Sequence, residues 1–315
     1  MKKLIIMLMC IVSLIGCGNQ EPETWTVTCP WAETGVAAQV NRQTAAKAAE
    51  VSKQFVLEPV TVKGDAKTVS EWLAGCDAES KELVFAGEGM YSIAPVMNPG
   101  SLNFTYEDFV FIENLYSSVF VLSARADLDL HSVIDVQLYM SEGTKVKVAV
   151  NGKAGSEGFL AYAFFGSMSH AEDIELITCD SADEAARAVV EGEAHFAVSH
   201  QSQIVEAYEA GKVTIIGAFD DKDITDGPLA GVEGVGKYGY PYFRNRCFIM
   251  APKGVNAGQT KMLKSLYNSI MEQEDIIDYY SDMMIEIDPM TDQEVKEHLE
   301  SVREIVEGYR TFFED

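Results

Sequence analysis

Short apolar runs rich in β-branched residues alternate along this chain with longer runs of helical character. Two of these alternations begin alike, near residues 30 and 153, with a strand, a turn and then a helix. Residues 25–29 lead into a helix predicted over about 35–53, and residues 146–150 lead through a glycine-rich turn into a helix that begins near Ser156. Such alternation is typical of βαβ units and mostly parallel sheets. The pattern therefore predicts an α/β protein with two similar lobes and a cleft between them.

Further strands are predicted at 55–62, 82–87, 195–199 and 213–219. Three helix starts show a Ser or Thr followed three positions later by Glu, which is the spacing of a capping box. They lie at Thr68, Ser181 and Thr291.

The last of these helices carries apolar residues at steps of three and four. They are Val295, Leu299, Val302, Val306, Tyr309 and Phe313. Such a stripe predicts a helix whose apolar face packs onto the body of the protein. A helix that binds a separate partner is the alternative.

The N-terminus has the order of a cleaved secretory signal. Lys2 and Lys3 precede an apolar run over 4–15, and the run ends in the sequence LIGC at Cys17. The run is too short to cross a bilayer, which needs roughly 20 apolar residues. The LIGC ending resembles a bacterial lipobox, which implies that residues 1–16 are removed and that Cys17 carries lipid. We therefore expect an extracytoplasmic protein anchored to a membrane; an ordinary signal with a coincidental cysteine is the alternative.

The composition is that of a soluble body with a strong negative charge. Apolar residues make up 47% of the chain and aromatic residues 10%, which is enough to build packed cores. The net charge of -25 becomes -27 when Lys2 and Lys3 leave with the signal, counting side chains only. Such a surface repels nucleic acid, and no basic stripe offsets it. We expect no nucleic-acid partner.

Four cysteines remain in the body of the chain: Cys29, Cys76, Cys179 and Cys247. They allow three complete pairings, and their spacing neither selects one nor excludes free thiols. Cys29 ends the first predicted strand, so its thiolate could act as a nucleophile paired with His200. A hydrolase that uses this pair is one alternative function. A surface lipoprotein that binds a protein partner, or serves as a sensor, is a second alternative.

Motifs for metals and cofactors are missing from the sequence. The 5 histidines are scattered, and neither an H-E-x-x-H pair nor a P-loop nor a G-x-S-x-G elbow occurs. The acidic run at 220–223 lacks the glycine and the closing glutamate of an EF-hand loop. We therefore predict no metal site and no cofactor.

Several blocks of sequence, in order, carry a resemblance to a known family. They are residues 29–35 with Arg42, residues 104–109, Gly155-Ser156 after the strand at 146–150, residues 191–196, and Tyr240-Pro241 followed by 248–254. Together they resemble the extracytoplasmic solute receptors of tripartite tricarboxylate transporters, the Bug-type proteins. The resemblance implies a two-lobed, type II periplasmic-binding-protein-like fold with a ligand cleft between the lobes. It also implies a binding protein rather than an enzyme, with membrane permease subunits as partners.

The chain departs from that family's pattern in its cleft loops. Ala38 stands where an Asp is usual, Phe159 where a His is usual, and Thr34 replaces a glycine. Glu33 and Glu157 place acids in the two loops. The resemblance implies a small carboxylate as ligand, and these departures leave a zwitterionic ligand open.

The family pattern also implies a division of the chain. Residues 17–23 form a lipidated tether, residues 24–123 with 241–315 form lobe 1, and residues 124–240 form lobe 2.

Physical reasoning about helix starts adds candidate ligand-binding residues to those implied by the family. A helix N-terminus presents unpaired N–H groups and partial positive charge, so it can hold an anion without a basic side chain. The predicted residues are Trp31, Thr34, Gly35, Gly87, Tyr91, Gly155, Ser156, Ser199, His200 and Arg246. Each has a structural alternative, such as a cap, a tight turn, lobe packing or an internal ion pair.

Overall fold

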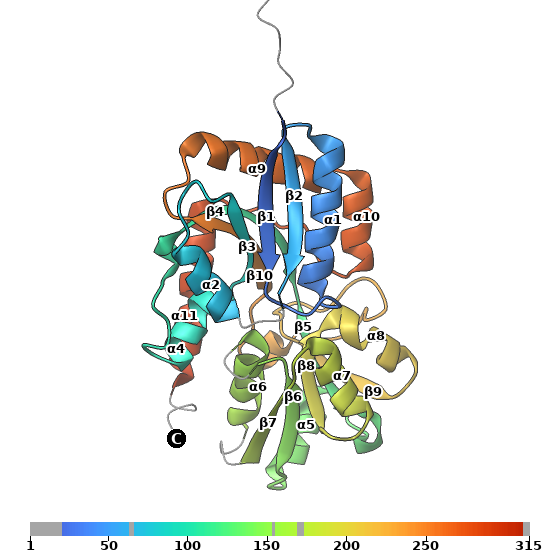
Figure 1. Cartoon of the computed structure of the whole chain (residues 1–315). Coiled ribbons are helices and arrows are strands. Elements are labelled where there is room, and N and C mark those ends of the chain that lie inside the picture. Colours follow the sequence, from blue (N-terminus) through green and yellow to red (C-terminus); the bar gives the residue numbers. More distant parts are fainter. Residues whose placement is uncertain (1–20, 63–65, 153–154, 169–172, 311–315) are drawn as a thin grey trace, which may run out of the picture.

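Two five-stranded sheets organise the chain into two lobes, one above the other in Figure 1. The computed structural model describes residues 21–62, 66–152, 155–168 and 173–310. The predicted signal, Cys17 with its predicted lipid, and Phe313 lie outside the described residues. No helix in the described ranges combines the length and the apolarity that a membrane crossing requires.

The first lobe is built on the sheet with strand order β2-β1-β3-β10-β4. Its strands are β1 (Glu23–Cys29), β2 (Phe55–Thr61), β3 (Glu82–Gly87), β4 (Phe109–Ser118) and β10 (Asn245–Pro252). Its helices are α1 (Val36–Val51), α2 (Ala66–Ala74), α3 (Gly89–Ser92), α4 (Ala94–Met97), α9 (Ala257–Met271), α10 (Glu274–Asp282) and α11 (Asp292–Gly308). A 3₁₀ turn, η1 (Tyr106–Asp108), precedes β4.

The second lobe is built on the sheet with strand order β7-β6-β8-β5-β9. Its strands are β5 (Phe120–Arg125), β6 (Val146–Val150), β7 (Ile174–Thr178), β8 (Phe196–His200) and β9 (Val213–Ala218). Its helices are α5 (Val133–Ser141), α6 (Ser156–Gly166), α7 (Ala182–Val190) and α8 (Gln201–Glu209), with 3₁₀ turns η2 (Ala126–Leu128) and η4 (Val235–Tyr238).

The expectation of mostly parallel sheets is correct for half of the pairings. β1 is parallel to β2 and β3, and β6 is parallel to β7 and β8. The strands that follow a passage between lobes, β5 and β10, are antiparallel to both of their neighbours. A chain that arrives from the other lobe enters the sheet at the end where the parallel strands stop, so it must run the opposite way.

The capping-box predictions have mixed outcomes. Thr291 forms the complete reciprocal box with Glu294 at the start of α11. Ser181 caps α7 by accepting the Glu184 N–H, while the Glu184 carboxylate accepts the N–H of Asp180 instead. The prediction at Thr68 is wrong, because α2 already includes Ala66 and Lys67. Both are good helix formers, so the helix extends past the expected cap.

The helix α11 joins the apolar cores of both lobes. Val295 and Leu299 pack in a cluster with residues of β3, β4 and β10, whereas Val302 and Val306 pack with the core of the second sheet. The predicted apolar stripe is thus buried from Val295 to Val306, and Tyr309 after it is half-buried. The division into 24–123 with 241–315 and 124–240 stays a proposal, and β5 of the second sheet already begins at Phe120.

Candidate functional site

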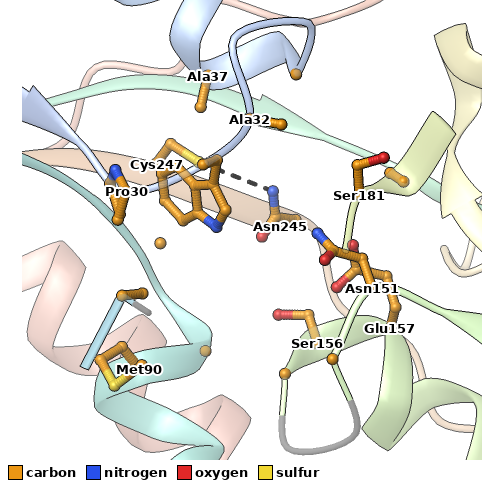
Figure 2. Close-up of a pocket in the computed structure, with 18 of the residues that line it drawn as sticks. Pro30, Ala32, Ala37, Met90, Asn151, Ser156, Glu157, Ser181, Asn245 and Cys247 are labelled. Carbon is orange, nitrogen blue, oxygen red and sulfur yellow. Dashed lines mark hydrogen bonds between the residues drawn. The ribbon is translucent and has the colours of Figure 1, made fainter. Parts of the chain in front are cut away.

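A cleft of about 1200 Å³ opens between the two lobes. Its walls form where strands of both sheets end, at the loops after β1 and β3 on one side and after β6, β7 and β8 on the other. Figure 2 shows Pro30 and Met90 on the first side, Ser156 and Asn151 on the second, and Asn245 between them. Ligands of α/β sheets bind outside the carboxyl ends of the strands, so this cleft is the candidate site.

On the first lobe, the start of α1 faces the cleft without a side-chain cap. Gly35 occupies the N-cap position with extended backbone, and no side chain accepts the N–H groups of the first turn. Val36 and Ala37, the first residues of the helix, line the cleft. Helix N-termini with open N–H groups favour bound anions.

Trp31 and Gly87 pack against each other in the first-lobe wall. The Trp31 ring meets the Phe85 ring edge-on, with centroids 6.3 Å apart. A Cβ at position 87 would lie 3.0 Å from the Trp31 ring, so the glycine makes room for the indole. Both residues line the cleft, as does Gly35. Thr34 does not line the cleft: it is exposed, and its carbonyl accepts a hydrogen bond from the side-chain N–H of Gln39.

On the second lobe, the starts of three helices converge on the cleft. Gly155 precedes α6 without a side-chain cap, Ser181 caps α7, and His200 caps α8. Gly155, Ser156, Ser181 and His200 all line the cleft. The three starts lie together because β7, β6 and β8 are neighbours in the sheet. Their positive ends make this wall a favourable surface for an anion.

Glu157 brings a carboxyl group to the same wall. Burial raises its pKa to about 7, and its own backbone N–H, a hydrogen-bond donor to the carboxylate, opposes that rise. Close to neutral pH this side chain therefore divides between a charged and an uncharged form.

The two lobes touch at Gly89 and Ser156. A Cβ at position 89 would lie 2.9 Å from the Ser156 Oγ and 3.4 Å from its backbone N. Gly89 starts α3 on the first lobe, and Ser156 starts α6 on the second. The structure therefore shows the lobes drawn together at the start of α6.

The charged lining is acidic rather than basic. Glu33, Glu157 and Asp180 line the cleft together with Lys67, and no arginine of the described residues does so. Arg244 is engaged elsewhere, in ion pairs of 2.9 Å with Asp220 and 2.7 Å with Glu286. An anion in this cleft would be held mainly by backbone and neutral side-chain donors.

Besides Thr34, three more of the predicted residues lie outside the lining. Tyr91 is buried in an aromatic cluster, and its hydroxyl lies 3.4 Å from the Ser70 Oγ. Ser199 is buried within β8. Arg246 pairs with Asp288 at 2.8 Å and contacts the ring of His298, beneath the loop that carries Gly87 and Gly89. The sequence could not show that these side chains are turned into the protein.

Polar residues that the sequence analysis did not select also line the cleft, among them Asn151, Ser181 and Asn245. Asn151 follows the predicted strand at 146–150 directly, and Ser181 heads a predicted helix, so both carried a usable signal of position. Asn245 starts β10, where it donates to the Ser118 Oγ at 3.3 Å. Its place in the cleft depends on a pairing between distant strands, for which no local signal exists.

The alternative with a cysteine nucleophile has little physical support. The four described cysteines are free thiols, and burial raises the pKa of Cys29 to about 11. Burial also lowers the pKa of His200 to about 4, which makes it a weak base. Cys29 is fully buried and does not line the cleft. Within the described ranges, no group of three or more His, Cys, Asp or Glu residues could hold a metal ion.

Comparisons with known proteins locate the fold. No family model matches the chain, and no curated protein matches it in sequence. Among solved structures, Rpa4515 of R. palustris with adipate has a TM-score of 0.80 at 16% identity, over 92% of this chain and 97% of that one. MatC from Rhodopseudomonas palustris with bound malate has a TM-score of 0.75 at 18% identity, over 93% and 99%. A TctC solute binding protein from Polaromonas without ligand has a TM-score of 0.68 at 16% identity, over 91% and 97%.

The chain has the two-lobed fold of periplasmic solute-binding proteins. The predicted fold class is confirmed, and the resemblance to the solute receptors of tripartite tricarboxylate transporters is confirmed as a likeness of fold. None of the three neighbours is described as an enzyme. At these sequence identities the likeness establishes the fold, and the solute has to be argued from the cleft.

Replacing Gly89 with alanine is expected to force the lobes apart at the Ser156 contact. Overpacking of this kind costs about 1–3 kcal/mol, which would lower the equilibrium ratio of closed to open form about five- to 160-fold. Small-angle X-ray scattering should show a larger radius of gyration for Gly89→Ala than for the wild type. Gly308→Ala is the control, because a Cβ there meets nothing within 4 Å. An unchanged radius in Gly89→Ala would contradict the contact.

Proposed function

We propose that this protein captures a small organic acid in the interlobe cleft and delivers it to the membrane permease of a tripartite tricarboxylate transporter. The observation that carries the proposal is that α1 and α6 both begin at the cleft, one on each lobe, without side-chain caps. The neighbours solved with malate and with adipate support a carboxylate as the solute.

A carboxylate between the two helix starts would accept hydrogen bonds from both lobes at once. Each helix N-terminus contributes typically about 0.3–1 kcal/mol to holding an anion, and up to about 2 kcal/mol when partly buried. This short-range term does not need a basic side chain, which fits the acidic lining. The net charge of -25 opposes the approach of an anion at long range, and salt screens that repulsion.

Closure of the lobes is the conformational step of the proposed mechanism. A solute that contacts both walls gains most of its interactions in the closed form, so its binding shifts the population toward closure. No bond is made or broken. The closed surface, rather than the solute alone, would be what the permease recognises.

We include the predicted lipid anchor in the proposal. Residues 1–16 are removed, Cys17 carries the lipid, and residues 17–23 tether the soluble body to the outer side of the membrane. Palmitate labelling in a bacterial host should mark the wild-type chain and leave Cys17→Ala unmarked. A chain that is secreted without label would contradict the anchor and leave the binding proposal intact.

Binding of a carboxylate is the direct test of the proposed function. We expect at least one member of a panel of malate, adipate, succinate, citrate and glutamate to raise the melting temperature of the purified protein. A solute at a hundredfold excess over its Kd stabilises the folded state by about 2.7 kcal/mol. Absence of any shift across the panel would contradict the proposal.

Ser156→Ala should then weaken binding about tenfold or more, because hydrogen bonds to charged groups contribute about 1.5–3 kcal/mol. Ser167→Ala is the matched control at the other end of α6, where the hydroxyl donates to the Ala163 carbonyl.

The proposal also predicts a pH dependence that comes from Glu157. Its pKa of about 7 means that the carboxyl group is mostly protonated below that pH and mostly charged above it. The affinity for a fully ionised dicarboxylate should therefore rise as pH falls from 8 to 6, since the repulsion between two carboxylates is removed.

Glu157→Gln imitates the protonated form, so its affinity should be as high as that of the wild type at pH 6 and nearly constant over this range. Calorimetric titration at each pH measures this. A variant that keeps the wild-type pH dependence would show that another group is responsible.

A further inference from the structure

His200 is a buried side chain in the cleft wall whose hydrogen bonding is incomplete. It lies at the end of β8, lines the cleft, and is 6% exposed. Its Nδ1 accepts the backbone N–H of Ser202 at 3.2 Å and lies 2.8 Å from the Ser202 Oγ. Its Nε2 has no hydrogen-bond partner among the described residues.

The capping contact fixes which ring nitrogen carries the proton. A backbone N–H can only donate, so Nδ1 must be the unprotonated nitrogen when it caps α8. In the neutral ring the proton then sits on Nε2. Burial lowers the pKa of His200 to about 4, so the ring is neutral at physiological pH. The free nitrogen is therefore a hydrogen-bond donor, Nε2–H.

A buried donor without an acceptor is unfavourable, and in native proteins such groups are rare. His200 lies in the wall that also holds the starts of α6 and α7, with Ser156 and Ser181 in the lining. Glu157 and Asp180 bring acidic groups to this wall. The Nε2 atom itself is covered in this structure, so an acceptor atom of a bound molecule would reach it once the ring turns toward the cleft that His200 lines.

We propose that His200 donates a hydrogen bond from Nε2 to an acceptor atom of the bound solute, and that it selects solutes with a carboxylate, carbonyl or hydroxyl oxygen at the end nearest α8. An ammonium group at that end has no lone pair and would leave the donor unpaired. The inference rests on the proposed function, and it favours an acid with oxygen acceptors at both ends over the zwitterionic ligand that the sequence left open.

His200→Asn is the variant that separates binding from folding. Asparagine is among the best N-cap residues, so its side-chain oxygen can still accept the Ser202 N–H while the Nε2 donor is lost. His200→Gln carries its amide further from the backbone, near the position of Nε2, and so can restore a donor. The melting temperature without solute reports whether the cap is kept.

The experiment is calorimetric titration of malate and adipate into the wild type and both variants. We expect the Kd for the better of the two acids to rise at least tenfold in His200→Asn, with partial recovery in His200→Gln and an unchanged melting temperature in His200→Asn. The wild type should also prefer adipate to 6-aminohexanoate, which has similar length and an ammonium group at one end. In His200→Asn, the ratio of the two dissociation constants should be closer to one than in the wild type.

The outcomes distinguish the inference from the proposed function. Wild-type binding that His200→Asn leaves unchanged would overturn the role of His200 while the solute-binding function stands, and would point to a water molecule as the partner of Nε2. A wild type that binds neither these acids nor any other member of the carboxylate panel would overturn both.

Discussion

The cleft depends on where the chain crosses between the two sheets, first from β4 to β5 and then back into β10; we call this crossing the passage. β4 ends at Ser118, β5 begins at Phe120, and the returning strand β10 begins at Asn245, which pairs with Ser118. Phe120 in turn pairs with His200. Because the passage lies at the carboxyl ends of the parallel strands of both sheets, the loops and helix starts that follow those strands face each other. Phe120 and Asn245, at the passage, line the cleft between them.

The cleft loop after β3 is supported by a buried network of charged groups. Glu88 is fully buried between Gly87 and Gly89, its backbone N–H donates to the Arg246 carbonyl, and its carboxylate contacts His298 of α11. Burial raises the pKa of Glu88, and the neighbouring His298 and Arg246 oppose that rise. Arg246 is thereby occupied beneath the loop, which explains why a residue expected to bind a carboxylate in the cleft lies outside its lining. Removing one member of such a network leaves a buried charge without compensation.

In the proposed complex, recognition would rely on neutral donors and on helix ends, and this would reconcile an acidic chain with an anionic solute. Helix N-termini and the Nε2–H of His200 supply fixed donors that need no counter-charge. Their effect is confined to short range, so the sign of the net charge affects the rate of encounter more than the complex itself. The partly protonated Glu157 further reduces the negative charge beside the start of α6.

The sequence by itself determined the β/α alternation, the capping box at Thr291 and the two strand–turn–helix openings, because propensity, periodicity and caps are local properties. The predicted residues at strand ends and in the loops after them also line the cleft: Trp31, Gly35, Gly87, Gly155, Ser156 and His200. Only the tertiary structure decided that Arg246 and Tyr91 are turned inward, that Asn245 reaches the cleft, and that α11 joins both cores. Those outcomes depend on pairings and packing between segments far apart in the chain, and no local pattern encodes which partner a side chain will meet.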